Sequence, residues 1–283
     1  MKLFSYMKFF YHLVSKLPIK VLYVFSDFFY VFISRFYRKK VVETNIKNSF
    51  PDLSEEQYKK IKKRFYKNFC DIFFETIKSY SIKKGDLLKH VSFRNIDIIN
   101  DHISNNERIV VLTSHQCNWE WLAISAEINL ISNLHFIYKK LSSPTFDEIM
   151  YKSRSRFGSI LLESKDAILK LKSDINNIKI LGVVADQSPN KKNRIEWARM
   201  LNQDTAFFDS INYIPKLTNS VVYYASMVRE SRGKYAVKFI KISASESSDK
   251  NSIIKEYAKQ LENQIIQNPG DWLWSHKRWK LTK

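Results

Sequence analysis

Residues 109–121 read IVVLTSHQCNWEW and pass from a strand pattern into a helix pattern without a linker. The first five residues are aliphatic or β-branched, which is typical of a short strand buried on both faces. A helical pattern follows over residues 118–131. A strand that leads at once into a helix is the repeating unit of α/β folds, so this stretch predicts a parallel sheet.

The same stretch contains a histidine and a glutamate, His115 and Glu120, five positions apart. Two residues at that spacing on one regular helix point about 140° apart and do not meet. His115 is therefore expected on the turn after the strand, at the carboxyl edge where open α/β sheets bind ligands. Glu120 is expected in the first helical turn, where it reaches back to orient the imidazole as a catalytic base.

The spacing alone is weak evidence, because the chain holds 6 histidines and 28 acidic residues and repeats the spacing at His102 and Glu107. The second pair lies in a polar segment ahead of the strand, for which a solvated loop is predicted. The position at a strand end favours His115.

The rest of the chain continues the alternation of strands and helices. Further strands are predicted over residues 134–138, 178–185, 220–227 and 235–242, and helices over 53–82, 145–157, 165–174, 206–217 and 251–267. Residues 41–51 are predicted to be a connector. The pattern predicts an α/β fold with a central, mostly parallel sheet flanked by helices.

The composition excludes several classes of protein. With 45% hydrophobic residues among 283 the chain is not disordered, and it contains neither GxGxxG nor GxxxxGK[ST], the motifs of dinucleotide and P-loop sites. Cys70 and Cys117 lie far apart and form no metal-like cluster. The formal net charge of +19 implies an anionic neighbour: a membrane surface, an acidic protein or nucleic acid. No nucleic-acid-binding motif is present, so we expect no nucleic acid partner.

Residues 21–36, VLYVFSDFFYVFISRF, form an apolar segment with basic residues on both sides. A helix of this length is about 24 Å long, which is shorter than the roughly 30 Å hydrocarbon core of a bilayer. We expect a retained N-terminal hydrophobic membrane-anchor helix that is inserted obliquely or lies in the interface. A buried helix of the core is the alternative.

Seven further blocks of the chain carry patterns that recur together in one family. They are residues 17–42, 45–50, 138–147 (YKKLSSPTFD), 154–158 (RSRFG), 185–188 (ADQS), 202–208 (NQDTAFF) and 269–280 (PGDWLWSHKRWK). Together with SHQCNWEW they resemble, in order, the lipid A biosynthesis acyltransferases, the lauroyl and myristoyl transferases of Gram-negative bacteria. That family belongs to the lysophospholipid-acyltransferase-like superfamily, and its first block usually reads GH-x-GNWE. Cys117 stands where the family has glycine, and we expect it to be a small packing residue and not a nucleophile.

The resemblance implies a glycerol-3-phosphate-acyltransferase-like catalytic domain over residues 51–283, with residues 1–50 as membrane anchor and connector. It also implies transfer of a fatty acyl group from an acyl carrier protein thioester to a hydroxyl of a phosphorylated glycolipid, at the cytoplasmic face of the bacterial inner membrane. His115 and Glu120 would be the catalytic pair. No cofactor and no metal are expected, since the acyl thioester is itself the activated co-substrate.

Other residues of the matching blocks receive supporting roles. Asn118, Arg154 and Arg156 are expected to contact the oxyanion or the acceptor phosphate, with a structural ion pair as the alternative for one of the arginines. The expected cleft-lining residues are Tyr138, Lys139, Asp186 and Gln187. For Asp186, fixing a loop is preferred over direct support of catalysis. The aromatic and basic residues between Trp272 and Trp279 are expected to anchor at the interface or to pack on the core.

Two other functions stay open at this point. The motifs describe the transfer step and not the acceptor, so a lysophospholipid, an ornithine lipid or another glycolipid is an alternative acceptor. A non-enzymatic basic protein that binds membranes or nucleic acid is a second and weaker alternative.

Overall fold

The computed structural model describes residues 2–242 and 252–283. Its α-helices are α1 (Lys2–Lys16), α2 (Ile19–Phe36), α3 (Lys39–Ser49), α4 (Glu55–Ser79), α5 (Lys84–Leu88), α6 (Asp97–Ser104), α7 (Trp119–Asn129), α8 (Pro144–Arg154), α9 (Ala167–Ser173), α10 (Ser210–Thr218) and α11 (Ser252–Gln267), with a 3-10 turn η1 (Pro269–Asp271). Its strands are β1 (Val91–Phe93), β2 (Arg108–Thr113), β3 (Leu134–Tyr138), β4 (Ile160–Glu163), β5 (Ile180–Val184), β6 (Ile195–Met200), β7 (Gln203–Phe208), β8 (Ser220–Ser231) and β9 (Lys234–Ile242).

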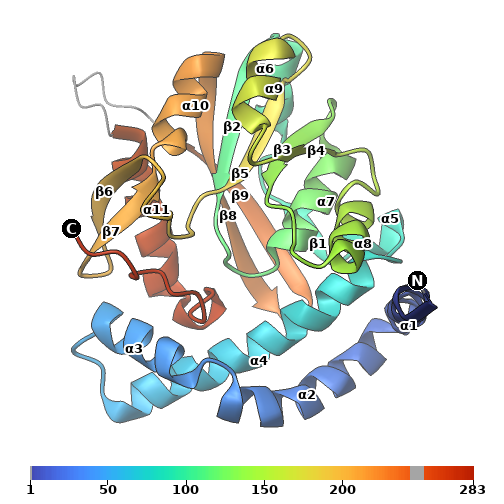
Figure 1. Cartoon of the computed structure of the whole chain (residues 1–283), viewed down its shortest axis with the longest axis vertical. Coiled ribbons are helices and arrows are strands. Elements are labelled where there is room, and N and C mark those ends of the chain that lie inside the picture. The colour runs from blue at the N-terminus through green and yellow to red at the C-terminus, as the bar shows by residue number, and fades with distance from the viewer. Residues whose placement is uncertain (1, 243–251) are drawn as a thin grey trace.

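A seven-stranded sheet forms the centre of the molecule, in the order β1-β9-β8-β2-β5-β3-β4 (Figure 1). Among the described strand pairs of this seven-stranded sheet β8–β9 alone is antiparallel, so the predicted mostly parallel sheet is confirmed. Strand β2 lies inside the sheet and buries both of its faces. Val110 and Leu112 point into one hydrophobic cluster, and Ile109 and Val111 into the other. The carboxyl ends of β2, β5 and β8 point toward the long helix α4 (Figure 1).

Several elements differ from the expectation. Residues 41–51 are not a connector, because helix α3 covers most of them and packs against α4. The predicted helix over residues 206–217 begins later, and strand β7 takes its first residues. Strands β6 and β7 form a hairpin whose two turn residues, Leu201 and Asn202, both have positive φ, as a type I′ turn requires. The sequence lacks the Asn-Gly signal that announces such a turn.

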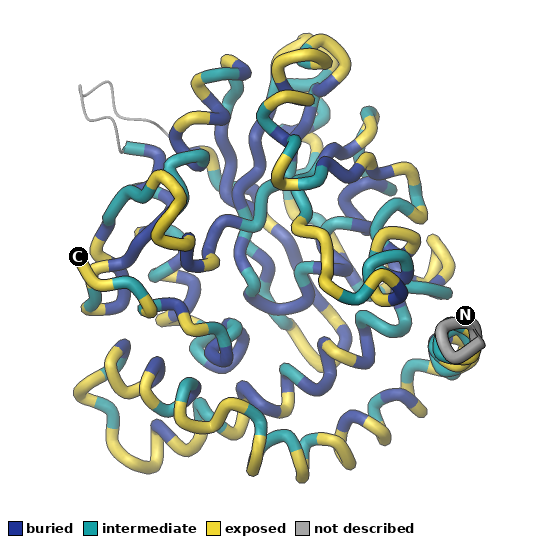
Figure 2. The backbone as a smooth tube through the Cα atoms, viewed as in Figure 1, coloured by how far each residue is buried: buried dark blue, intermediate teal, exposed yellow. Residues whose placement is uncertain are grey.

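The N-terminal helices lie on the outside of the molecule. Helix α2 runs along α4 on the side away from the sheet, and Figure 2 shows exposed residues all along its length. Within the described ranges, 2–242 and 252–283, no single helix is long and apolar enough to cross a bilayer. Residues 6–16 and 19–36 satisfy the criterion only together, with a bend of 113° between them.

Candidate active site

The turn between β2 and α7 carries His115, as predicted. Two residues after His115, Cys117 has a φ of 55°, a left-handed conformation that a glycine adopts without strain. The N–H of Cys117 donates to the carbonyl of Asp271 at 2.9 Å, and its Sγ lies 3.2 Å from the carbonyl of Met227. Asn118 then caps α7 by accepting a hydrogen bond from the N–H of Trp121 at 2.9 Å. The turn is therefore held from two sides.

The strand register brings a carboxylate to His115. Thr113 of β2 pairs with Val184 of β5, and His115 and Asp186 each lie two residues beyond this pair. Nδ1 of His115 is 2.6 Å from Oδ1 of Asp186, and the backbone N–H of His115 donates to Oδ2 at 2.9 Å. Asp186 thus fixes both the ring and the main chain of His115, so the loop-holding and imidazole-orienting roles fall to one residue.

Asp186 is ionised and inaccessible. Its side chain is 2% exposed, and the indole of Trp272 donates to Oδ2 at 2.8 Å. Burial alone would raise the pKa of Asp186. The electrostatic interaction with His115 and the hydrogen bonds from His115 and Trp272 outweigh burial and hold the pKa of Asp186 below its ordinary value. A carboxylate in this state accepts the Nδ1 proton of the imidazole and leaves a lone pair on Nε2.

The Nε2 atom of His115 faces the open side of the site. The side chain of His115 is 14% exposed, and the edge of the Trp119 ring packs against it with 4.9 Å between ring centres. The amide nitrogen of the exposed Gln187 lies 3.1 Å from Nε2. An N–H group in that place donates to the lone pair, which agrees with the tautomer that Asp186 imposes.

Glu120 does not make the hydrogen bond that was expected of it. It forms a bidentate ion pair with Arg154, at 2.8 Å to Nε and 2.6 Å to a terminal nitrogen, and also accepts from the Trp119 indole. Glu120 lies in the first turn of α7, as expected, but its partner there is the guanidinium. Burial opposes ionisation of Glu120, and the charge of Arg154 overcomes it, so the pKa of Glu120 is lowered.

The alternative of a structural ion pair therefore applies to Arg154, and its partner is Glu120. Arg156 donates to the carbonyl of Tyr80 and lies over the ring of Phe157, outside the His115 contacts. The amide of Asn118 is fully buried, and both of its ends are engaged, one by Trp121 and the other by Glu75. Its side chain is thus not directed at an oxyanion.

The remaining predicted residues lie at neighbouring strand ends. Tyr138 closes β3 and is half-buried against Tyr151, while Lys139 follows it and is exposed. At the start of α7, the backbone N–H groups of Trp119 and Glu120 have no acceptor among the residues that the structure describes. These groups point out of the first turn of the helix that follows His115.

The other histidine pair also forms a contact. His102 lies in helix α6 and not in a loop, and its ring joins Glu107 to the hydroxyl of Tyr223, which is 2.8 Å from Nε2. Tyr223 is buried, so this chain of contacts ends inside the protein and offers no free base. The two histidine–glutamate pairs have the same spacing in sequence. They differ in the group that contacts Nε2, which is a buried tyrosine hydroxyl for His102 and the amide of the exposed Gln187 for His115.

A family model described as bacterial lipid A biosynthesis acyltransferase matches residues 2–281. The chain belongs to this family. Membership of this family indicates an acyltransferase and disfavours the non-enzymatic alternative. A comparison with curated proteins gives no match.

In the structure of this lipid A acyltransferase Trp272 and Trp274 are buried, so the closing segment packs on the core, which was one of the two roles expected for it. The sequence did not reveal that Trp272 also supplies a donor to Asp186. His276 accepts a hydrogen bond from the N–H of Ser188 at 3.1 Å and so holds the loop that carries Asp186. Its partial burial lowers the pKa of His276 to about 4, and the imidazole is neutral.

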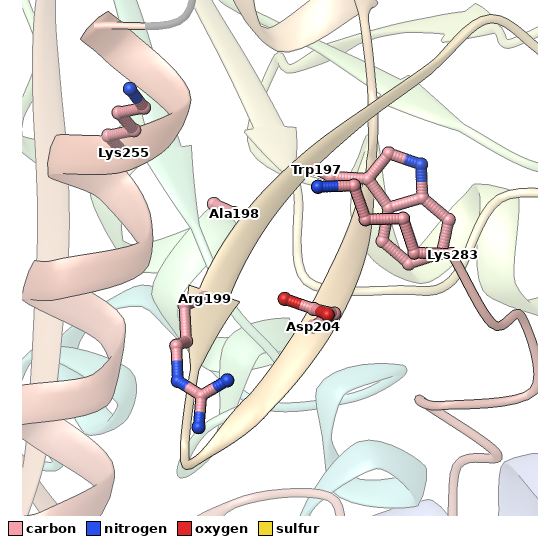
Figure 3. Close-up of a pocket in the computed structure, with 6 residues that line it drawn as sticks. All are labelled: Trp197, Ala198, Arg199, Asp204, Lys255 and Lys283. Carbon is pink, nitrogen blue, oxygen red and sulfur yellow. The ribbon is translucent and has the colours of Figure 1, made fainter.

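A cavity in the described part of the acyltransferase lies away from these residues. Figure 3 shows this space of about 360 Å³ on the β6–β7 hairpin beside α11, lined by Trp197, Ala198, Arg199, Asp204, Lys255 and Lys283. None of the predicted site residues lines it. The candidate active site is therefore defined by its hydrogen bonds and not by this cavity.

Proposed function

We propose that this protein transfers a fatty acyl chain from an acyl carrier protein thioester to a hydroxyl of a lipid A precursor, with His115 as general base and Asp186 as its orienting carboxylate. The contact that carries the proposal is the 2.6 Å pair between His115 Nδ1 and Asp186 Oδ1 at the carboxyl edge of the sheet. An alcohol does not attack at neutral pH without a base at hydrogen-bond distance, and Nε2 of His115 supplies one.

In the proposed reaction Gln187 swings aside and the acceptor hydroxyl takes its place on Nε2. The hydroxyl proton passes to Nε2 while the oxygen forms a bond to the thioester carbonyl carbon. The resulting tetrahedral oxyanion collapses, the C–S bond breaks, and the imidazolium returns the proton to the thiolate. Asp186 stabilises the transient positive charge on the ring. No acyl-enzyme and no cofactor take part, because the thiolate is already a good leaving group.

The oxyanion of this reaction needs donors, and two groups are suited to supply them. The free N–H groups of Trp119 and Glu120 begin α7, where the helix dipole favours negative charge. Arg154 keeps N–H groups beyond those bound by Glu120, and its side chain is 19% exposed. A guanidinium that Glu120 holds in one orientation is suited to an oxyanion or to a phosphate of the acceptor.

We further propose that residues 1–50 seat the enzyme on the anionic surface of the inner membrane. Large apolar side chains are exposed along α1 and α2, namely Tyr6, Phe9, Phe10, Leu13, Val21, Val24, Phe25, Phe28, Phe29, Val31, Phe32 and Phe36. Two polar side chains of α2 point the opposite way: Tyr23 and Ser26 bond to Glu75 and Asp71 of α4. A helix with its polar side toward the protein and its apolar side outward is suited to the lipid interface.

The +19 charge supports the same arrangement. The acidic carrier protein, the phosphorylated glycolipid and the anionic leaflet would all be attracted to a basic protein, and their encounter would weaken with added salt. Flotation with vesicles that contain about 30% anionic lipid tests the membrane part. We expect the protein to float with the vesicles, and replacement of Phe28 and Phe32 by serine to leave it at the bottom of the gradient.

One experiment tests the transfer itself. The purified protein is incubated with acyl carrier proteins that carry different chains and with a tetra-acylated lipid A precursor, and the products are identified by mass spectrometry. We expect the precursor to gain one acyl ester with wild-type protein and none with His115→Ala. Acylation of lysophospholipid or ornithine lipid in a competing mixture, with no gain on the precursor, would transfer the assignment to the alternative acceptor.

A further inference from the structure

A second buried carboxylate lies behind the catalytic turn. Glu75 of α4 has no exposed surface. Its Oε1 accepts a hydrogen bond from the Tyr23 hydroxyl at 2.7 Å, and its Oε2 accepts from the Tyr235 hydroxyl and the Asn118 amide, each at 2.7 Å. Its backbone carbonyl also accepts from the Trp121 indole at 3.0 Å. Burying a carboxylate is costly unless its oxygens are satisfied, and here uncharged donors satisfy both.

The chemistry of this carboxylate fixes the direction of the Asn118 amide. A carboxylate only accepts hydrogen bonds, so Asn118 must turn its NH₂ group toward Glu75. The amide oxygen then faces α7, where it accepts the N–H of Trp121 at 2.9 Å and caps the helix. A neutral amide in place of Glu75 would accept either orientation of Asn118, and one of the two orientations removes the cap.

We propose that Glu75 is a positioning residue that fixes the turn carrying His115. This inference rests on the proposed function, since it assigns Glu75 a role through the base and not in the chemistry. Only two residues separate His115 from Asn118, and one of them, Cys117, has a strained left-handed backbone. A turn that stores strain needs a firm anchor on each side. Asp186 anchors its first residue and Glu75, through Asn118, anchors its last.

The same carboxylate connects the turn to the N-terminal helices. Tyr23 of α2 lies against Gly233, where a Cβ atom would approach its hydroxyl to 2.1 Å, and Arg232 stacks over its ring at 4.4 Å. Tyr23 is thus clamped with its hydroxyl on Glu75. One residue further along α2, Val24 is exposed. Glu75 therefore joins the catalytic turn to the helix that we place on the membrane.

The test exchanges the carboxylate and the amide between positions 75 and 118. Glu75→Gln is expected to lower kcat about 100-fold, the loss that follows from displacing a catalytic group by roughly 1 Å, with KM for the acyl donor within about twofold of wild type. In Glu75→Gln with Asn118→Asp the amide of residue 75 donates to the new carboxylate, whose second oxygen caps α7. We expect the kcat of this double variant to be at least tenfold higher than that of Glu75→Gln.

Matched controls separate positioning from stability. Glu127 is a buried carboxylate near the far end of the same helix α7, where it accepts hydrogen bonds from the N–H of Leu134 and from Ser159. Glu127→Gln is expected to lower the melting temperature and to leave kcat unchanged. His115→Ala supplies the inactive reference for the proposed function.

Two results would overturn the inference. If Glu75→Gln keeps kcat within threefold of wild type while His115→Ala is inactive, the positioning role is wrong and the proposed function stands. If the double variant is no more active than Glu75→Gln, or if neither folds, Glu75 contributes to stability alone. Full activity of His115→Ala would instead refute the proposed function.

Discussion

Replacing Asp186 by asparagine tests which carboxylate orients the base. The Oδ2 atom of Asp186 accepts two N–H groups, from the His115 backbone and from Trp272, whereas the contact of Oδ1 among the described residues is with the imidazole. The oxygen of the new amide will therefore take the Oδ2 position, and its NH₂ group will face Nδ1. The ring must then accept at Nδ1 and carry its proton on Nε2, where the base is needed.

The size of the effect follows from the geometry. With Nδ1 and Oδ1 2.6 Å apart, the charges of an imidazolium and Asp186 are centred about 4 Å from each other. At an effective dielectric constant of about 20 their attraction is about 4 kcal/mol, which corresponds to roughly 1,000-fold in rate. The wrong tautomer adds to this loss. We expect Asp186→Asn to lower kcat by 10³ to 10⁴-fold, on the order seen when a triad carboxylate is replaced.

The assay measures acyl transfer from labelled acyl carrier protein to the lipid acceptor in vesicles at saturating substrate, with circular dichroism to confirm folding. Asp174→Asn, a change at an exposed carboxylate after α9, serves as the control and should retain wild-type kcat. A folded Asp186→Asn protein with more than a tenth of the wild-type kcat would refute the assignment of Asp186.

Three further outcomes follow from contacts of the site. Glu120 acts on its surroundings through Arg154, so the combined change Glu120→Gln with Arg154→Gln should cost no more kcat than the worse single change, and additive losses would contradict this. Cys117→Gly relieves a left-handed strain of about 1 kcal/mol, so it should melt higher than Cys117→Ala although it is smaller, with both variants active; a higher melting point for alanine would contradict it. His276 has a folded pKa of about 4 against an ordinary 6.5, so only the unfolded state binds its proton between those values. The contribution of His276 to the free energy of unfolding is therefore present above pH 6.5 and is lost as the pH falls toward 4. In urea titrations the free energy of unfolding of His276→Gln should decrease less over this pH range than that of wild type.

Much of the scaffold could be predicted from local pattern. The apolar runs at 109–113 and 134–138 coincide with β2 and β3 to within a residue. A continuous apolar run of this short length is typical of a strand that is buried on both faces. The β6–β7 hairpin could not be predicted, since its strands mix Glu, Arg and Gln with apolar residues and its turn uses Leu201 and Asn202 in place of a glycine. Helix α3 was missed because its sequence is largely polar and its burial depends on contacts with α4.

The site also has a part that could be predicted from the sequence and a part that could not. The position of His115 was predictable, because it depends on the strand and helix that flank it in sequence. The partner of its ring was not, because it depends on which strand lies beside β2, and strand order is not written in local pattern. Asp186 follows the neighbouring strand β5, whereas Glu120 is nearer in sequence but is drawn to Arg154. A nearby acid is therefore a weaker guide than an acid at the end of an adjacent strand.

The pairing of Thr113 with Val184 has a consequence for reading related sequences. His115 and Asp186 lie side by side because each follows its residue of this pair by two positions, so their contact depends on the number of residues between strand end and side chain. One residue inserted after Val184 would carry Asp186 about 3.3 Å onward and reverse the side toward which it points. Such a chain would keep every residue of the motifs and still lose the hydrogen bond that orients its catalytic histidine. The number of residues between the end of the strand and the acid is therefore the feature to compare in related sequences.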